Sequence, residues 1–394
     1  MTAATAIESS GPSAFTVWLA AFGTGILVAT IYYAQPLIDP ISRDIGLSRQ
    51  AAGLIVTVMQ VGYGFGLALI VPLADRFENR FLVTLSLMVT AASLAVIAFA
   101  RSEPGFLVPA TVAGVACVGA QVLVPMVAGM ASPERRGRVI GTVMAGLLTG
   151  IMLARPASSF LASFVGWRGV FIVASVVTFL FGILLRMFLP EHRPKTRPAY
   201  LATLRSIVAV VGRYPILRRR MVYQMIMFGL FTAFWTTAPL MLVDHFGLDQ
   251  QQIALFALAG AGGALAAPIA GRLADRGLSR IATICCGIGA MIILPLTDGL
   301  IAWGSVVGLA LSAVFFDAFV QGNQVLGQRM IFALSDSERA RINSAYMTSI
   351  FLSGSIASAL GPVLYAHFGW TAMAVAGVVL GAVIAFGELL RKQS

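Results

Sequence analysis

Two charged residues lie inside long apolar segments of the chain, where their chemistry has a high energetic cost. Asp317 is the one acid of 16 in the middle of such a segment, and Arg155 is the one base of 27. A charge at the centre of a lipid bilayer costs at least about 2.5–3.5 kcal/mol, so each must face a cavity or a partner. Arginine keeps its proton, whereas a buried carboxylate can take one up. We expect Asp317 to be a protonation site and Arg155 to be its partner or an anchor for an anionic solute; the alternative is a static buried pair.

Amide and aromatic side chains recur at helical spacing on these apolar segments. Gln321 and Gln324 follow Asp317 at i+4 and i+7 and therefore share its helix face. Gln121 is the counterpart of Gln324 in the first half of the chain. Such stripes either bond a neighbouring helix or line a wet cavity. The further solute-site candidates, which combine aromatic faces with amides, are Tyr32, Gln35, Gln60, Tyr63, Trp235, Asn343 and Tyr346.

The sequence lacks the residue patterns of common enzyme sites. It contains no Gly-x4-Gly-Lys-Ser/Thr loop for phosphate, and its three histidines stand near the ends of apolar segments. We therefore expect no catalytic residues, no metal site and no cofactor. The cysteines, which we expect to be buried thiols, are Cys117, Cys285 and Cys286.

The composition requires lipid as the solvent of this protein. Mean hydropathy is +0.89, and 58% of the 394 residues are hydrophobic, while 11% are charged. Soluble domains carry roughly 25% charged residues. A spanning helix needs about 20 mostly apolar residues. The segments that meet this length are, approximately, 14–37, 50–73, 80–100, 105–130, 138–164, 168–189, 219–243, 252–274, 280–297, 302–327, 340–365 and 370–390.

The positions of the charges predict the topology. A basic linker, 190–218, separates a bundle of six spans in 14–189 from another in 219–394, and residues 1–13 form a short leader that does not resemble a signal peptide. Of the 27 Lys and Arg residues, 22 lie on the side that both termini share and four on the other. The positive-inside rule then predicts that both termini are cytoplasmic. Because the net charge of +11 sits in these loops, we expect no nucleic-acid partner.

The two halves repeat one another. Residues 119–123, 136–139 and 166–167 recur with an offset of 203, and 73–76 recur with an offset of 200. Matches in the same order with a nearly constant offset indicate duplication. Parallel six-helix repeats place a solute site between the halves, near the middle of the membrane. We therefore expect an all-α polytopic membrane protein of twelve helices in two pseudo-symmetric six-helix bundles.

The loops after the second and eighth spans carry the pattern Gly-x-x-x-Asp-Arg-x-Gly-Arg/Lys-Arg/Lys in altered form. Residues 271–280 read GRLADRGLSR and depart at one basic position, whereas residues 71–80 read VPLADRFENR and depart at both glycines. With the twelve spans, this resembles the major facilitator superfamily. The resemblance implies a conformational latch whose salt bridges favour the outward-open state. Its residues would be Asp75, Arg76, Arg80, Asp275, Arg276 and Arg280.

A narrower resemblance is to the bacterial branch of arabinose/sugar and drug efflux permeases. The stretches that carry it are YYAQP at 32–36, QVGYG at 60–64, LARP at 153–156, DAFVQ at 317–321 and RINSAYM at 341–347. The antiporter pattern of the fifth span is half met, because Gly141 and Gly150 fit while Arg155 replaces its proline.

These observations predict a monomeric transporter that exports a small organic solute in exchange for protons. One titrating acid suits antiport, since proton and solute can compete for one state. Uptake by proton symport or by passive facilitation is the first alternative. The second is a membrane receptor that binds solute without moving it.

Overall fold

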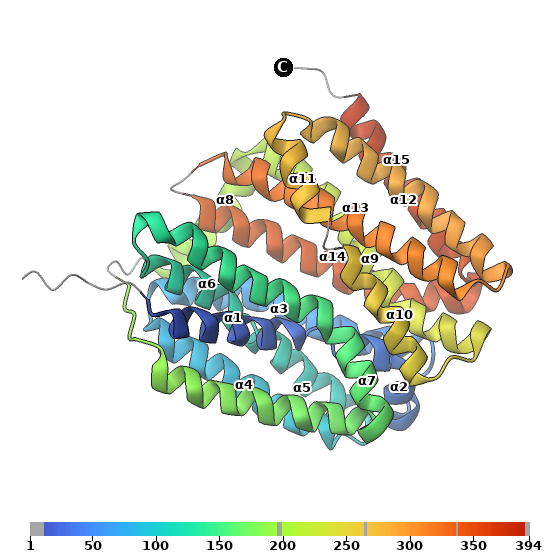
Figure 1. Ribbon diagram of the computed structural model, residues 1–394, viewed down its shortest axis with the longest axis horizontal. Helices are drawn as coiled ribbons and strands as arrows, with labels where there is room; N and C mark the ends of the chain where they lie inside the picture. The colour runs from blue at the N-terminus through green and yellow to red at the C-terminus, as the bar shows by residue number, and fades with distance from the viewer. Residues whose placement is uncertain (1–11, 195–198, 264–265, 336–337, 391–394) are drawn as a thin grey trace, which may run out of the picture.

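The computed structural model describes residues 12–194, 199–263, 266–335 and 338–390, and these residues form an all-helical protein. The first half contains α1 (Ala14–Ala29), α2 (Ile38–Ile45), α3 (Leu54–Leu69), α4 (Asn79–Ala98), α5 (Glu103–Ala116), α6 (Gly119–Gly129) and α7 (Pro133–Phe188). The second half contains α9 (Pro215–Phe246), α10 (Gln250–Gly262), α11 (Ala266–Asp275), α12 (Ser279–Ala302), α13 (Val306–Phe332), α14 (Arg339–Phe368) and α15 (Thr371–Leu389). The two sets form separate bundles that pack side by side (Figure 1).

Twelve passes are present within the described residues. Ten helical stretches are long and apolar enough to cross a membrane. One of them, within α7, contains two passes, because Gly166 has φ 67° and ψ 173° and breaks the helix direction. The twelfth is α1, whose 16 residues are followed by turns and by the 3-10 helix η1 (Gln35–Leu37). The twelve-helix prediction is therefore confirmed, although several passes consist of two shorter helices.

The first pass ends earlier as a helix than its hydropathy predicts. We predicted a helix over 14–37, yet α1 stops at Ala29, and Tyr32 lies in the turn that follows. The α-helix expected around Tyr32 and Gln35 is therefore absent, but both side chains still face one side, because both contact Arg155. Pro36 prevents an α-helix from continuing through residues 32–36, because it lacks the N–H group that would bond to the Tyr32 carbonyl.

The duplication is visible in matching turns of the two halves. Gly166 and Gly369 both have positive φ, 67° and 63°, a conformation that glycine adopts at little cost. The tryptophan after each glycine is buried and donates through Nε1, Trp167 to Asp44 and Trp370 to Thr297, both over 2.8 Å. The Trp167 N–H and the adjacent Arg168 hold the pKa of Asp44 below its usual value.

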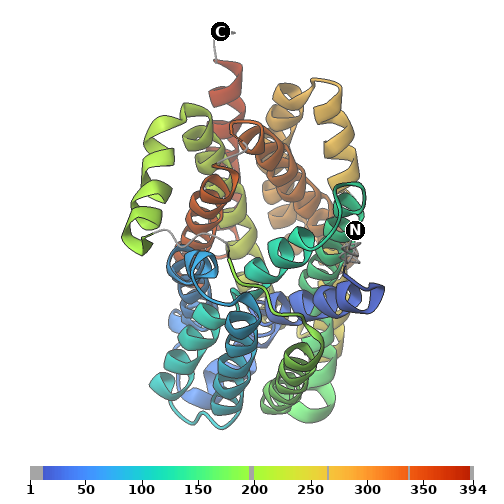
Figure 2. The same ribbon diagram turned by 90° about the vertical axis from the view of Figure 1, so that its left-hand side faces the viewer.

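The linker contains a helix that its sequence did not lead us to predict. Within the predicted segment 190–218, α8 (Tyr200–Arg213) packs against α14 and α9. Tyr200 donates to the carbonyl of Leu69, and Arg213 forms an ion pair of 2.6 Å with Glu338. We call the end of the molecule that carries α8 the linker end, and it faces the viewer in Figure 2. The opposite end, which carries α2, is the α2 end.

Polar contacts between the halves gather at the α2 end. Arg49 forms an ion pair of 2.5 Å with Asp244, and Thr57 shares a hydrogen bond of 2.8 Å with Ser358. Gln250 Nε2 donates to the Pro36 carbonyl over 2.8 Å and to Ser159 Oγ over 2.7 Å. Between α3 and α14 at the linker end, Ser344 donates to the Leu67 carbonyl over 3.2 Å.

The cysteines only partly match the expectation of buried thiols. Cys117 and Cys286 are buried, but Cys285 is exposed. Cys285 precedes Ile288 and Ile292 by one and two helical turns on the outward face of α12, and both of these are exposed as well. A hydropathy pattern cannot separate this face from the packed one, because lipid accepts the same side chains as the core does.

Candidate functional site

Asp317 is buried in the second half and held by one tryptophan. Its carboxylate is 2% exposed and lies on α13. Trp235 Nε1, on α9, points at both carboxylate oxygens, 3.0 Å from Oδ1 and 3.2 Å from Oδ2. Gly260 on α10 allows this approach, because a Cβ atom there would stand 2.8 Å from the indole and 3.1 Å from Oδ2.

Arg155 is buried in the first half and reaches across the boundary to the second. Its Nε donates to Gln35 Oε1 over 2.6 Å, and its side chain is 4% exposed. The guanidinium carbon lies 4.8 Å from the ring centre of Tyr32 and 4.9 Å from those of Phe231 and Trp235. Each desolvated cation–π contact of this kind contributes about 2 kcal/mol. The charge is therefore stabilised by aromatic faces and an amide.

The indole of Trp235 connects the two buried charges. No ion pair joins Arg155 and Asp317 within 4.0 Å, yet each interacts electrostatically with the other. One face of the indole meets the guanidinium, and its N–H meets the carboxylate. We call Arg155, Trp235 and Asp317 the bridged pair. Neither charge faces lipid, and the arrangement crosses the boundary between the halves.

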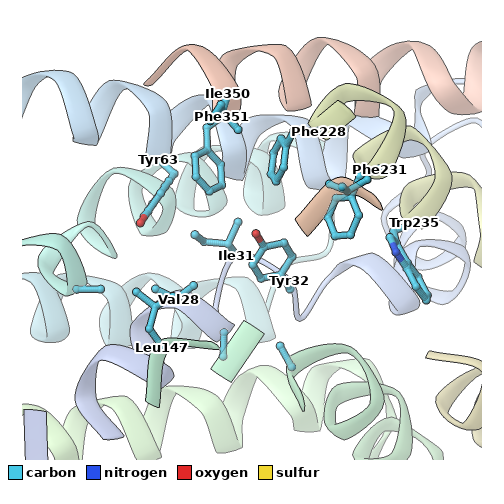
Figure 3. Packing of buried hydrophobic residues seen from close by; sticks show 14 of the residues in the cluster. Val28, Ile31, Tyr32, Tyr63, Leu147, Phe228, Phe231, Trp235, Ile350 and Phe351 are labelled. Atoms are coloured by element: carbon cyan, nitrogen blue, oxygen red, sulfur yellow. The ribbon is translucent and has the colours of Figure 1, made fainter. Parts of the chain in front are cut away.

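Aromatic rings continue from the bridged pair along this boundary. Figure 3 shows Tyr63 and Tyr32 from the first half facing Phe351, Phe228 and Phe231 from the second. Ring centres are 4.5 Å apart for Tyr63 and Phe351, 5.1 Å for Phe351 and Phe228, and 5.6 Å for Phe228 and Phe231. A cavity of about 10 Å³ lies beside Arg155 and Trp235, about the size that a single water needs.

Amides accompany these rings. Gln121 Nε2 donates to the Tyr63 hydroxyl over 3.1 Å, so these two predicted residues do meet. Gln60 is fully buried, and neither its amide nitrogen nor its oxygen has a hydrogen-bond partner among the described residues. Gln35 Nε2 and one terminal nitrogen of Arg155 are likewise without partners there. Buried amides without partners cost free energy, which a bound polar solute would recover.

Other predicted residues lie apart from the bridged pair. Gln321 and Gln324 are half-buried on α13, toward the linker end from Asp317, and Asn343 is half-buried on α14. Tyr346 is buried and lies near Arg220, and its hydroxyl has no hydrogen-bond partner in the described part of the chain. A role for these four in binding the solute remains a prediction.

The predicted latch residues lie at the linker end, and the following contacts of these residues are mostly within one half. Asp275 pairs with Arg329, Arg80 pairs with Glu191 over 2.5 Å, and Arg280 donates to the carbonyls that end α15. Asp75 is the exception, because it interacts electrostatically with Arg341 of the other half. The latch role of these residues, including Arg76 and Arg276, remains a prediction.

Sequence reasoning missed several residues of the site. Phe228, Phe231 and Phe351 are three of 25 phenylalanines in the chain, and nothing in their spacing distinguishes them. Arg220 is 1% exposed and Glu388 is 2% exposed, although both lie near the predicted ends of spans. Burial of a charge so close to a loop depends on tertiary packing, which a hydropathy pattern does not contain.

Replacing Gly260 with alanine tests the packing around the bridged pair. The new methyl group would overlap the indole of Trp235, and overpacking costs roughly 1–3 kcal/mol, so we expect a lower melting temperature and altered tryptophan fluorescence. Gly271→Ala is the control, because no described atom lies within 4 Å of a Cβ atom there and the helix gains propensity. Equal stabilisation by both variants would contradict the described contact.

Comparison with known proteins gives consistent matches. The family model described as Major Facilitator Superfamily matches residues 15–316 and 221–393. The chain is 37% identical over 369 residues to the Escherichia coli O157:H7 protein called Uncharacterized transporter YgaY, covering 93% of this chain and 92% of the relative. It is also 35% identical to SCO4007 of Streptomyces coelicolor, which is named as a probable transporter. That match covers 92% of this chain and 85% of the relative.

More distant matches cover half the chain or share the fold alone. The purine ribonucleoside efflux pump NepI of Salmonella typhimurium is 28% identical over 185 residues, 46% of each chain. The crystal structure of a mutant of the nucleoside transporter NupG superposes with a TM-score of 0.76 over 95% of this chain and 98% of that one, at 12% identity. The inward-facing structure of a bacterial homologue of the human lysosomal transporter Spinster gives a TM-score of 0.74 at 14% identity. It covers 96% of this chain and 98% of that one.

Proposed function

The chain belongs to the major facilitator superfamily, whose members are transporters and not enzymes, and from this membership we propose that it exports a small organic solute in exchange for protons. It is a multi-pass protein of the lipid bilayer, and its family binds small molecules. The observation that carries the proposal is the bridged pair, a buried acid and a buried base connected by one indole across the boundary between the halves.

In the proposed mechanism, proton and solute compete through this pair. When Asp317 is ionised, it accepts the Trp235 N–H and attracts the charge of Arg155 through the indole. In this ionised state Arg155 and Trp235 are positioned to bind the solute's polar group and ring. Protonation of Asp317 removes that attraction, so Arg155 and Trp235 leave this arrangement and the affinity for solute falls. A ligand shifts a conformational equilibrium only as far as its affinities for the two states differ. Solute bound to Arg155 and a proton bound to Asp317 would supply that difference.

The side chains at the boundary favour a flat solute with polar groups. Aromatic faces are provided by Tyr32, Phe231 and Trp235. Among the described residues, the Gln35 amide nitrogen and both amide atoms of Gln60 have no hydrogen-bond partner. Rings and amides together recognise a heteroaromatic base that carries hydroxyl groups. Purine ribonucleosides are therefore the first class to assay, a choice that the name of the half-length relative NepI supports.

Alternating access would use the contacts at the α2 end as one of its gates. We place this end outside, by the positive-inside rule, and the linker end with both termini in the cytoplasm of a bacterial inner membrane. Solute would then enter from the linker end while Gln250, Arg49 and Thr57 hold the opposite end together. The latch around Asp75 and Arg341 would close the linker end in the other state. We propose that a single chain completes this cycle as a monomer.

Gln250→Ala is expected to weaken the outer gate. It removes two hydrogen bonds between the halves, each worth about 0.5–1.5 kcal/mol, so the open state should gain about tenfold in population. The measurement is labelling of Ala238→Cys by an impermeant maleimide from outside whole cells, in a Cys285→Ser background. Gln251→Ala is the control, because Gln251 is the neighbouring residue and its side chain is exposed. Equal labelling of Gln250→Ala and the control would contradict this gate.

Purified protein in vesicles with an imposed pH gradient tests the function as a whole. We expect purine ribonucleosides, or a related flat solute found by thermal-shift screening, to accumulate on the side that is acidic. Accumulation on the alkaline side would indicate symport, and flux without dependence on the gradient would indicate facilitation. Binding without any flux would indicate a receptor. Each of these three results contradicts antiport.

A further inference from the structure

A second polar cavity lies at the linker end of the second half, away from the bridged pair. Its volume is about 250 Å³, and Arg220, Ser279, Arg280, Thr283 and Glu388 line it. These residues come from α9, α12 and α15. Arg220 precedes Trp235 by 15 residues on α9, which places the two roughly 22 Å apart along the helix. The cavity is therefore distinct from the proposed transport site.

Arg220 is a buried cation that makes hydrogen bonds to neutral groups. It is 1% exposed, and its terminal nitrogens donate to Thr283 Oγ1 over 2.9 Å and to the Asn323 carbonyl over 3.5 Å. Among the described residues, its Nε has no hydrogen-bond partner, and no carboxylate oxygen lies within 4.0 Å of its nitrogens. Glu388 attracts Arg220 from beyond that distance, but its carboxylate is paired with Arg219. Burying a charge without a counter-charge in direct contact is costly. An anion bound beside this side chain would remove that cost.

The start of α12 adds positive potential to the same cavity. Leu278 is the N-cap residue, and its side chain cannot accept a hydrogen bond from the N–H groups of the first turn. By contrast, Asp249 caps α10 and Ser305 caps α13. The first N–H groups, which no side chain caps, and the dipole of this 24-residue helix favour an anion at its start.

The charges of the described residues around the cavity do not balance. Arg280 lines the cavity and donates to the carbonyls of Glu388 and Leu389, and Arg219 pairs with the Glu388 carboxylate over 3.2 Å. Together with Arg220 these make three guanidinium groups and one carboxylate, so the described residues leave two positive charges. Inorganic phosphate and the phosphate of an anionic lipid both match that excess and the donor groups available.

We propose that this cavity binds a phosphate-class anion and that Arg220 is its principal ligand. The Ser279 hydroxyl and the first N–H groups of α12 complete the set of donors. The anion neutralises Arg220 and ties the starts of α9 and α12 to the end of α15. This proposal does not depend on the transported solute or on proton coupling.

Titration of the purified protein with sodium phosphate, at constant ionic strength, tests the site. We expect the melting temperature in neutral detergent to rise with phosphate and the apparent Kd to weaken at least tenfold in Arg220→Gln. Arg205→Gln, which removes an exposed charge from α8, is the control and should leave the Kd unchanged. The same proteins would then be compared in nanodiscs of phosphatidylglycerol and of phosphatidylcholine. If the melting temperature of the wild type is higher in phosphatidylglycerol and Arg220→Gln removes this difference, a lipid is the source of the phosphate.

A second variant keeps the test decisive if Arg220→Gln does not fold. Leu278 is 37% exposed, so Leu278→Asp is compatible with folding and places a carboxylate at the start of α12. We expect it to raise the melting temperature without phosphate and to abolish the response to phosphate or phosphatidylglycerol. If the wild-type protein responds to neither anion, or if Leu278→Asp responds as the wild type does, the proposal is wrong.

Discussion

Asp317→Asn is expected to abolish solute flux driven by a pH gradient while leaving solute binding measurable. Asparagine keeps an oxygen that can accept the Trp235 N–H, now 3.0 Å from Oδ1, so the geometry of the site is preserved. The substitution removes only the ability to exchange a proton. Gradient-driven uptake into vesicles should fall at least about tenfold, which corresponds to about 1.4 kcal/mol of coupling free energy.

Solute exchange without a gradient separates loss of coupling from loss of folding. We expect Asp317→Asn to retain exchange of labelled for unlabelled solute across the vesicle membrane. Asp298→Asn, in the same half and bonded to Thr371, removes a carboxylate far from the bridged pair and should behave as the wild type. Full gradient-driven flux in Asp317→Asn would exclude this residue as the protonation site.

Arg155→Lys is expected to weaken solute binding although it keeps the positive charge. The planar guanidinium contacts three aromatic rings and donates to Gln35, whereas an ammonium group cannot reproduce those stacked contacts. Hydrogen bonds to charged groups contribute about 1.5–3 kcal/mol, so the Kd for solute should rise about tenfold or more. Thermal shift or calorimetry on the purified protein provides the measurement.

Arg168→Lys is a matched control for this substitution. Arg168 also lies over an aromatic ring, 4.2 Å from the centre of Trp167, and pairs with Asp44, but it is at the α2 end. We expect its replacement to leave solute affinity unchanged. If Arg155→Lys also bound solute with wild-type affinity, Arg155 would not be the anchor of the solute.

Much of the fold was predictable because lipid imposes strict requirements on the sequence. Apolar length identifies the passes, and the offset of 203 pairs Gly166 with Gly369, which share a backbone conformation. The breaks within passes were not predicted. A hydropathy pattern is continuous across Ala29 and Gly166, while the helix stops at the first and turns at the second. Helix α8 was missed because its arginines indicate a solvated loop as readily as an amphipathic helix.

The site was predictable only where a residue type is costly in lipid. Asp317 and Arg155 were identified by that cost, and the structure brings them together with Trp235, Tyr32 and Gln35. That an indole would stand between them could not be predicted, because it depends on how the halves pack. The buried Arg220 was not recognised for a related reason, since it follows two other arginines in a stretch that resembles loop charge.

Proton release on solute binding tests the bridged pair most directly. Purified protein at a pH where Asp317 is partly protonated would be titrated with solute, by calorimetry in buffers that differ in ionisation enthalpy. Competition between solute and proton predicts that wild-type protein releases protons as solute binds and that Asp317→Asn releases none. Solute binding with the same proton release in both proteins, or with none in the wild type, would contradict coupling through Asp317.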